Sequence, residues 1–376
     1  MYLKKLSLVN FKNYEHAELS FSTGFNCFVG DNGGGKTNLL DAIHCLSFCK
    51  SFINPIESQN IKHNNELYIV QGRFVLNEKI EQIYCGFRKG KKKQFQRNKK
   101  EYNRLADHIG LLPVVLVSPE DTALLQEGSD LRRKFIDTII AQLDSVYLDK
   151  LISYNRIISQ RNALLKKFAM TRSFDQDSID VWDEQLVALG TVIYEKRVAF
   201  LDAFTPIFKN HFEFISQGKE EVSLEYRSQL TGKKFSAVLQ EVMEKDRLVQ
   251  YSTAGIHRDD LICTLDGYPI KKMGSQGQRK SFVIALKLAQ FDFLKSEKGY
   301  APLLLLDDIF DKLDPTRVTQ LMELVNGSNF GQIFITHTHE ERLLKVLEGI
   351  DDVKIFRVTE GIVKDGEEKL IGEDGA

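Results

Sequence analysis

The sequence predicts an α/β fold, in which a sheet covered by helices on both faces is interrupted by a mainly helical lobe. Three apolar runs predict buried strands: Phe25 to Val29 near the start of the chain, and Leu303 to Leu306 and Gln332 to Ile335 near its end. Helix-period patterns dominate between them, from about Asp121 to Asp246. Strands that alternate with helices are typical of a sheet buried on both faces.

The composition is that of an ordinary globular protein, and it excludes several classes. The chain has 376 residues, and 51 lysines and arginines face 52 aspartates and glutamates. The resulting net charge of -1 excludes a histone-like basic protein and an acidic tail protein. No apolar run approaches the roughly 20 residues of a membrane span, and the first residues alternate instead of forming a signal-peptide core. We therefore expect a cytoplasmic protein without a membrane partner.

The elements group into three segments. Residues 1–120 form the first part of a head, residues 121–246 form the helical lobe, and residues 247–376 form the second part of the head. Alternating apolar residues predict short strands in the first segment, and an apolar stripe at helical spacing predicts a helix after Gly30. The stripe consists of Leu39, Leu40, Ile43 and Leu46.

A glycine-rich segment from Gly30 to Thr37 matches the P-loop pattern G-x-x-x-x-G-K-[ST] in full. It follows a predicted strand and precedes a predicted helix, which is the context that this pattern requires. Backbone N–H groups and the helix dipole would then bind nucleotide phosphates, Lys36 would neutralise them, and Thr37 would hold Mg²⁺. The alternative is a glycine-rich turn that only caps a helix. The predicted contacts to the nucleotide are Gly30, Asp31, Asn32, Gly33, Gly34, Gly35, Lys36, Thr37 and Asn38.

The apolar strand at Leu303 to Leu306 ends in two carboxylates, Asp307 and Asp308. Open α/β sheets bind ligands at the carboxyl ends of their strands. We assign Asp307 to the Mg²⁺ shell and Asp308 to polarising the attacking water, since phosphoryl transfer depends on positioning and charge stabilisation. A strand followed by an ordinary acidic turn is the alternative, and the P-loop in the same chain argues against it.

Two more segments are candidates for the same site. His337 follows the last predicted strand and could reach the γ-phosphate, whereas His339 points elsewhere if the backbone is extended. Structural histidines are commoner than catalytic ones. The second segment opens a predicted helix and provides a hydroxyl and free N–H groups for an anion. It consists of Ser275, Gln276, Gly277 and Gln278.

The order of these motifs resembles that of ABC-type ATPase heads, and within them the RecF family of DNA replication and repair proteins. The resemblance runs nearly from end to end and includes blocks in both the head and the lobe. These blocks are residues 10–14, 30–43, 118–121, 132–137, 160–165 and 254–260. Three positions depart from the usual patterns: Ile256 replaces a proline of the family, Ile53 stands where a basic residue is common, and Asp308 replaces the glutamate of ABC transporters. A paired aspartate is familiar in RecF-like heads, which are slow ATPases.

This resemblance implies a homodimer that closes around ATP and clamps DNA. The P-loop nucleotide of one subunit would be covered by Ser275 and Gly277 of the other. The chain carries one copy of each half-site and no internal repeat, so two composite sites need two chains. The resemblance also places Lys12 and Asn13 near the phosphates and adds Asp314 to the nucleotide site.

The resemblance further implies a slow, DNA-stimulated ATPase that binds duplex DNA near single-strand gaps without sequence specificity. With RecR and RecO, such a protein helps RecA load onto single-stranded DNA in recombinational repair and replication restart. No residue pattern in the chain demonstrates these protein partners.

A run of positive charge is the candidate DNA contact. Residues 88–100 contain eight lysines and arginines and no acidic residue. Such a cluster can bind the DNA backbone by counterion release, although a charge run is more often a solvated hairpin tip. The residues predicted to contact DNA are Lys91, Lys92, Lys93 and Arg97.

Three rival functions stay open at this point. An SMC-type ATPase needs hundreds of heptad residues, but only 239 positions separate Lys36 from Ser275 and no sustained heptad run fills them. An ATPase subunit of a transporter would copurify with membranes. A fused nuclease would need a second acidic metal site, and the remaining acidic clusters form no coherent one.

Overall fold

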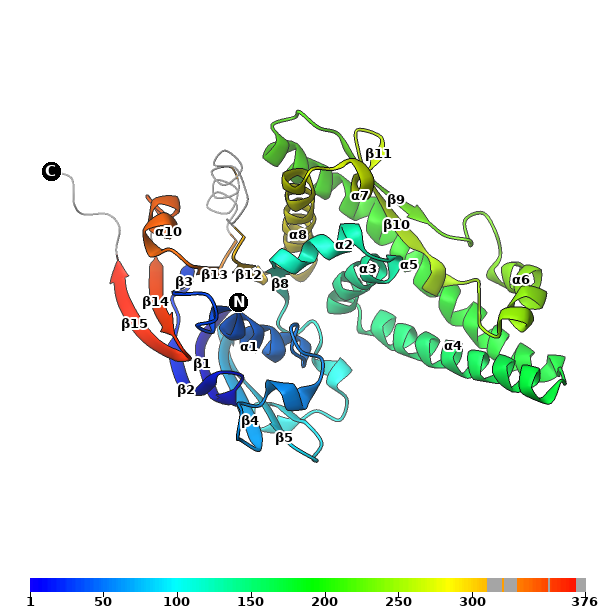
Figure 1. Cartoon of the computed structure of the whole chain (residues 1–376), viewed down its shortest axis with the longest axis horizontal. Coiled ribbons are helices and arrows are strands. Elements are labelled where there is room, and N and C mark those ends of the chain that lie inside the picture. The colour runs from blue at the N-terminus through cyan, green and yellow to red at the C-terminus, as the bar shows by residue number, and fades with distance from the viewer. Residues whose placement is uncertain (310–319, 321–329, 351, 370–376) are drawn as a thin grey trace. The chain divides into compact units, whose positions relative to one another are not determined.

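The computed structural model describes residues 1–309, 320, 330–350 and 352–369 (Figure 1). The chain divides into two compact units. The first comprises Met1–Asp121, Phe214–Ser216 and Lys280–Ala376, and the second comprises Thr122–Glu213 and Gln217–Arg279.

The first unit contains the predicted parallel sheet, with the strand order β15-β14-β3-β13-β12-β8. Five of its strands run parallel, and β15 pairs antiparallel with β14 at one edge. Every residue of β3, β12 and β13 is buried, as expected for a sheet covered on both faces. These strands are β3 (Phe25–Val29), β8 (Val114–Val117), β12 (Leu303–Asp307), β13 (Ile333–His337), β14 (Val353–Thr359) and β15 (Ile362–Lys369). The α/β prediction is confirmed.

A second, antiparallel sheet belongs to the same unit and has the order β2-β1-β4-β5-β6-β7. Its first strand buries Leu3, Leu6 and Leu8. Leu6 and Leu8 follow the alternation of a strand, and a register shift between Leu3 and Lys5 separates them from Leu3. Its strands are β1 (Tyr2–Phe11), β2 (Tyr14–Ser20), β4 (Leu67–Leu76), β5 (Lys79–Arg88), β6 (Gln94–Arg97) and β7 (Lys100–Glu101).

Helix α1 (Lys36–Phe48) shares one hydrophobic core with both sheets. The predicted stripe is buried there, with Leu39, Leu40, Ile43 and Leu46 fully covered. The amide of Gln332 joins the sheets: its Nε2 donates to the carbonyl oxygens of Leu3 and Ser22 at 2.8 and 2.7 Å. The core therefore fixes α1, and the loop before it, against two sheets at once.

The second unit is mainly helical and adds a small antiparallel sheet, β11-β10-β9. The helices are α2 (Ala123–Gln126), α3 (Ser129–Leu143), α4 (Ser145–Thr171), α5 (Gln176–Ser216), α6 (Phe235–Val249) and α7 (Ile270–Met273). The last three residues of α5 belong to the first unit. The strands are β9 (Val222–Arg227), β10 (Asp260–Leu265) and β11 (Tyr268–Pro269). Helix α8 (Gln276–Lys298) begins in this unit and continues into the first, which also contains α10 (Glu340–Val346). Short 3₁₀ helices lie at residues 57–60, 105–108, 119–122 and 256–258.

The lobe ends later than the sequence division placed it. Helix α6 runs across the predicted boundary at residue 246, and the second unit continues to Arg279. The physical reason is that β10 pairs with β9 over six residues, so the chain beyond α6 completes a sheet that began before it.

A fully buried arginine organises the lobe. The Arg161 guanidinium lies 2.5 Å from Asp183, 2.6 Å from Asp246 and 2.9 Å from the Ser252 hydroxyl. A second buried arginine, Arg197, binds Asp137 and the carbonyl of Ile256. Several of the family-like blocks of the lobe therefore hold its helices together through buried ion pairs.

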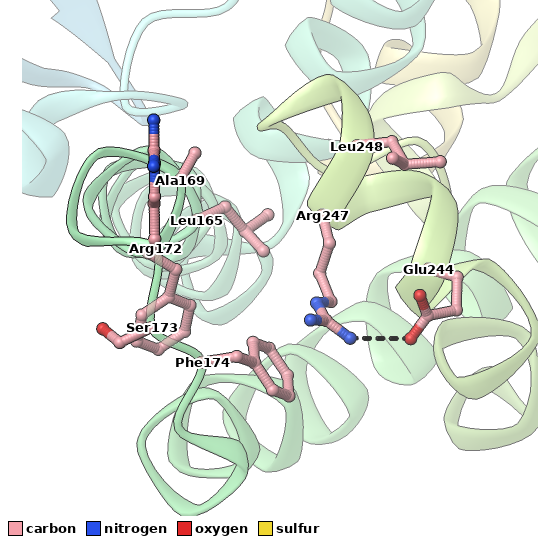
Figure 2. Close-up of a pocket in the computed structure, with 9 residues that line it drawn as sticks. Leu165, Ala169, Arg172, Ser173, Phe174, Glu244, Arg247 and Leu248 are labelled. Atoms are coloured by element: carbon pink, nitrogen blue, oxygen red, sulfur yellow. Dashed lines mark hydrogen bonds and ion pairs between the residues drawn. The ribbon is translucent and has the colours of Figure 1, made fainter.

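A hollow of about 300 Å³ opens on the lobe beside α4 and α6 (Figure 2). Arg247 donates to Glu244 at 2.8 Å, and its guanidinium stacks 4.0 Å from the centre of the Phe174 ring. The lining residues are Leu165, Phe168, Ala169, Arg172, Ser173, Phe174, Glu244, Arg247 and Leu248. None of the predicted nucleotide or DNA contacts is among them. Of the helices described, none has the length and apolarity to span a membrane.

Candidate functional site

The P-loop connects β3 to α1 at the carboxyl end of the parallel sheet. Gly30 has a φ of +148°, and a side chain there would collide with the carbonyl oxygen of Val358. Gly35 caps α1 with a φ of +115°. The glycines therefore allow the tight turn, which leaves the first N–H groups of α1 without helical partners and able to bind an anion.

The Lys36 ammonium is folded back onto this loop. Its Nζ donates to the carbonyl oxygens of Gly30 and Asp31 at 2.7 and 2.9 Å. Burial lowers the pKa of Lys36, and the nearby Asp308 and Asp307 carboxylates oppose that shift. A positive charge is thus held beside the amides that would bind phosphate.

Asp307, at the end of β12, joins the P-loop to the neighbouring strand. Its Oδ1 accepts hydrogen bonds from the hydroxyls of Thr37 at 2.9 Å and Thr336 at 2.7 Å. Burial raises the pKa of Asp307, while the two hydroxyl bonds act in the opposite direction. Thr336 is a site residue that our sequence analysis did not assign, although its place directly before His337 at a strand end was a usable signal.

Asp308 turns in another direction, because its backbone is left-handed with a φ of +46°. Its N–H donates to the Thr336 hydroxyl at 2.9 Å, and its Oδ1 lies 3.5 Å from Nδ1 of His337. Burial lowers the pKa of His337, which favours the neutral imidazole. The two adjacent carboxylates therefore face different partners, and His339 is not part of either contact.

The donor set fits Mg²⁺. The Thr37 hydroxyl and the Asp307 carboxylate provide adjacent oxygen atoms, which hard cations prefer. Within the described ranges, no group of three or more His, Cys, Asp or Glu side chains could hold a metal ion. A site with few protein ligands is typical of Mg²⁺, which keeps waters and substrate phosphates in its shell.

Lys12 and Asn13, which the resemblance placed near the phosphates, contact different parts of the protein. Lys12 forms a buried ion pair with Asp41 of α1 and not with the P-loop. The carboxylate of Asp41 is further held by the Ser51 hydroxyl at 2.6 Å. Asn13 donates to the Gly34 carbonyl at 3.0 Å and accepts from the Asn38 amide at 2.8 Å.

The segment from Ser275 to Gln278 starts α8, as predicted, in the second unit. The Ser275 hydroxyl accepts from the Gln278 N–H at 3.2 Å, and the Gln278 side chain accepts from the Ser275 N–H at 2.7 Å. This reciprocal pair is a capping box. Ser275 and Gln276 are exposed and Gly277 is partly exposed. Asp314 lies outside the described residues.

The basic run forms the hairpin between β5 and β6 and the turn after it. Two of the four predicted DNA contacts are engaged in ion pairs: Lys93 with Glu57 at 2.6 Å and Arg97 with Glu81 at 2.7 Å. The side chain of Lys93 is only 9% exposed, so in this arrangement it faces Glu57 and not solvent. The exposed members of the run are Arg88, Lys89, Lys91, Lys92, Lys99 and Lys100.

Comparisons with known proteins point in one direction. The family model described as RecF/RecN/SMC N terminal domain matches residues 2–364. The chain is 51% identical to the DNA replication and repair protein RecF of Phocaeicola vulgatus, over 98% of this chain and 99% of that protein. It is 50% identical to the protein of the same name from Flavobacterium johnsoniae, over 95% of this chain and 100% of that protein.

Solved structures give the same result. The structure of the recombination mediator protein RecF with ATP, in the RecFOR pathway, matches with a TM-score of 0.87 and 29% identity, over 97% of this chain and 98% of that one. The Smc head domain of Pyrococcus furiosus, bound to the C-terminal domain of ScpA, matches with a TM-score of 0.58 and 20% identity, over 97% of this chain and 96% of that one. The second likeness concerns the fold alone.

Proposed function

The chain belongs to the RecF family of DNA replication and repair proteins, and on that basis we propose that it is an ATP-dependent DNA-binding protein of replication and repair. Two copies would dimerise around ATP and bind duplex DNA near single-strand gaps. The observation that carries the proposal is the contact between Thr37 of the P-loop and Asp307 of β12, because it joins the two halves of an ATPase centre. The related RecF structure is that of a complex with ATP, which supports the same ligand here.

Nucleotide binding would use the P-loop amides and Lys36. The Lys36 ammonium would leave the carbonyls of Gly30 and Asp31 for the phosphates, which are stronger acceptors because they are charged. Thr37 and Asp307 would hold Mg²⁺, which supplies charge neutralisation at the phosphates when bound.

Hydrolysis would depend on Asp308 and His337. The Asp308 side chain is 36% exposed, so a water molecule can reach its carboxylate. In our proposal Asp308 polarises that water and His337 donates a hydrogen bond to the γ-phosphate. The slow ATPase would act as a switch, with ATP closing the dimer and hydrolysis opening it.

The dimer would complete each site with the α8 start of the other copy. Ser275 and Gly277 are available there, since the capping box leaves the Ser275 side chain exposed. The dipole of the 23-residue α8 favours an anion at this end.

DNA binding would involve the exposed part of the basic hairpin. Lys91 and Lys92 are predicted contacts at exposed positions, whereas the partly exposed Arg97 is paired with Glu81. Lysines at such a tip neutralise phosphates without reading bases, which agrees with binding that is not sequence-specific. Cooperation with RecR and RecO and assistance to RecA loading belong to the proposal through family membership and through the related RecF, a recombination mediator of the RecFOR pathway.

Fluorescence anisotropy of a labelled gapped duplex tests the proposal. ATP should tighten DNA binding by the wild-type chain, whereas the Lys36→Ala variant should bind equally with and without ATP because it lacks the phosphate-binding cation. Wild-type binding that does not respond to ATP would contradict the proposal.

A further inference from the structure

We infer that Asn13 and Tyr14, at the tip of the β1–β2 hairpin, are positioning residues that orient the P-loop amides and do not themselves contact the nucleotide. The inference rests on the proposed nucleotide binding. The resemblance placed Asn13 near the phosphates, and it gave no role to Tyr14.

Two side chains of the hairpin hold two successive P-loop carbonyls. Asn13 Nδ2 donates to the Gly34 oxygen at 3.0 Å, and the Tyr14 hydroxyl donates to the Gly35 oxygen at 3.0 Å. The backbone N–H of Gly361 also donates to the Gly34 oxygen at 3.0 Å. The P-loop is therefore held from the hairpin and from the turn between β14 and β15.

Both polar groups of Asn13 are already in use. Its Nδ2 binds Gly34, and its Oδ1 accepts from Nδ2 of Asn38 at 2.8 Å. Tyr14 is fully buried, and burial raises its pKa, so the phenol stays protonated and remains a donor. The Asn13 amide and the Tyr14 hydroxyl are thus each bonded to another part of the protein.

The hairpin side chains pack closely against Gly35. A side chain at Gly35 would collide with Nδ2 of Asn13 and would lie 2.9 Å from the Tyr14 oxygen. The glycine at this position thus allows the hairpin tip to approach the P-loop backbone directly.

Peptide geometry connects these contacts to phosphate binding. In a planar trans peptide the C=O of one residue and the N–H of the next point in opposite directions. Fixing the Gly34 carbonyl therefore aims the N–H of Gly35, and fixing the Gly35 carbonyl aims the N–H of Lys36. The Gly35 oxygen also accepts from the Asn38 N–H at 3.0 Å, so the Tyr14 bond adds to a helix bond. The aimed amides lie at the start of α1, where anions bind.

A positioning role and a direct contact to the γ-phosphate predict different nucleotide preferences. P-loop amides contact the β-phosphate, which ATP and ADP share, so disturbing their orientation should weaken both ligands by the same factor. Losing a ligand of the γ-phosphate should weaken ATP alone.

Calorimetric titration of Mg-ATP and Mg-ADP into Tyr14→Phe and Asn13→Ala tests the inference. Tyr14→Phe should bind both nucleotides roughly fivefold more weakly, the factor that corresponds to one hydrogen bond. Asn13→Ala, which loses the bonds to Gly34 and Asn38, should weaken both nucleotides by at least that factor. The ratio of the two affinities should stay at the wild-type value, and turnover at saturating ATP should change less than affinity.

Tyr68→Phe is the matched control. Tyr68 is also fully buried in the antiparallel sheet, and its hydroxyl donates to Glu57 at 2.5 Å instead of to the P-loop. Loss of the Tyr68 hydroxyl should leave the affinities for ATP and ADP unchanged. Wild-type affinity in Tyr14→Phe, or an Asn13→Ala variant that loses ATP and keeps ADP, would overturn the inference. A wild-type chain that binds neither nucleotide would overturn the proposed function and this inference together.

Discussion

The hydroxyl of Thr37 donates a 2.9 Å hydrogen bond to the carboxylate of Asp307, which lies 270 residues away in the chain. The contact joins the first turn of α1 to the end of β12, at the carboxyl end of the parallel sheet. Asp308, the next residue, faces His337 instead. The pair of aspartates therefore divides into one side chain toward the expected metal and one toward the expected water.

This division predicts opposite behaviour for two single substitutions. Asp308→Asn should still bind ATP and dimerise, but hydrolysis should fall at least about a hundredfold, the usual scale for removing a catalytic group. Asp307→Asn should weaken Mg-ATP binding and prevent dimerisation. Steady-state phosphate release and sedimentation measure the two properties. An Asp308→Asn variant that fails to dimerise with ATP would show that the roles are assigned wrongly.

Neutralising the exposed lysines of the basic hairpin should reduce the salt dependence of DNA binding. In Lys91→Gln/Lys92→Gln the slope of log K against log[salt] should become shallower by up to about 2, since each phosphate contact contributes about 0.9. The control is Lys166→Gln/Lys167→Gln, which removes the same charge from two exposed lysines of α4. Equal slopes in wild-type and hairpin variant would remove this hairpin from the DNA surface.

Removing the buried arginine Arg161 should lower the stability of the lobe. Arg161→Ala leaves Asp183 and Asp246 without their cation, and breaking a buried ion pair costs about 3 to 5 kcal/mol. Trp182 is the one tryptophan of the chain and lies in α5, so its fluorescence in urea follows the lobe. Lys166→Ala, at an exposed position of α4, the helix that contains Arg161, should change the urea midpoint little. A midpoint unchanged in Arg161→Ala would contradict the role of this network.

Folding stability should fall as the pH falls below neutrality. Burial lowers the pKa of His108 from 6.5 to about 4. Its Nε2 lies 2.7 Å from the Leu46 carbonyl oxygen. Between these values the unfolded chain binds the proton and the folded chain does not, so acid favours unfolding. His108 alone should account for about 2 kcal/mol between pH 7.5 and pH 5.

The variant His108→Gln isolates this contribution. His44 and His257 have pKa values lowered in the same way, to about 4, so the wild-type loss includes them as well. Urea unfolding followed by circular dichroism at the two pH values should show a smaller pH effect in the variant. An identical pH effect in both proteins would contradict the prediction.

The local parts of the site could be predicted from the sequence because each is contiguous. The P-loop combines a pattern of eight residues with a strand before it and a helix after it, and β12 and β13 are apolar runs that end in polar residues. The carboxyl ends of parallel strands lie at the same end of a sheet, so the approach of Asp307 to Thr37 followed from the fold class.

Other parts could not be predicted because they depend on long-range partners. A charge run does not indicate which lysine will find a buried acid, and Lys93 reaches Glu57, which precedes it by 36 residues. Helical spacing ended the lobe at residue 246, since nothing local showed that β10 would pair with β9. Tyr14 was missed because a tyrosine at a hairpin tip carries no sign of the carbonyl that it binds.

Sedimentation velocity of the purified chain with and without saturating Mg-ATP tests most directly whether nucleotide joins two copies. The account predicts a monomer without nucleotide, a dimer with ATP, and a monomer in both conditions for Lys36→Ala. A wild-type chain that binds ATP and still sediments as a monomer would contradict it.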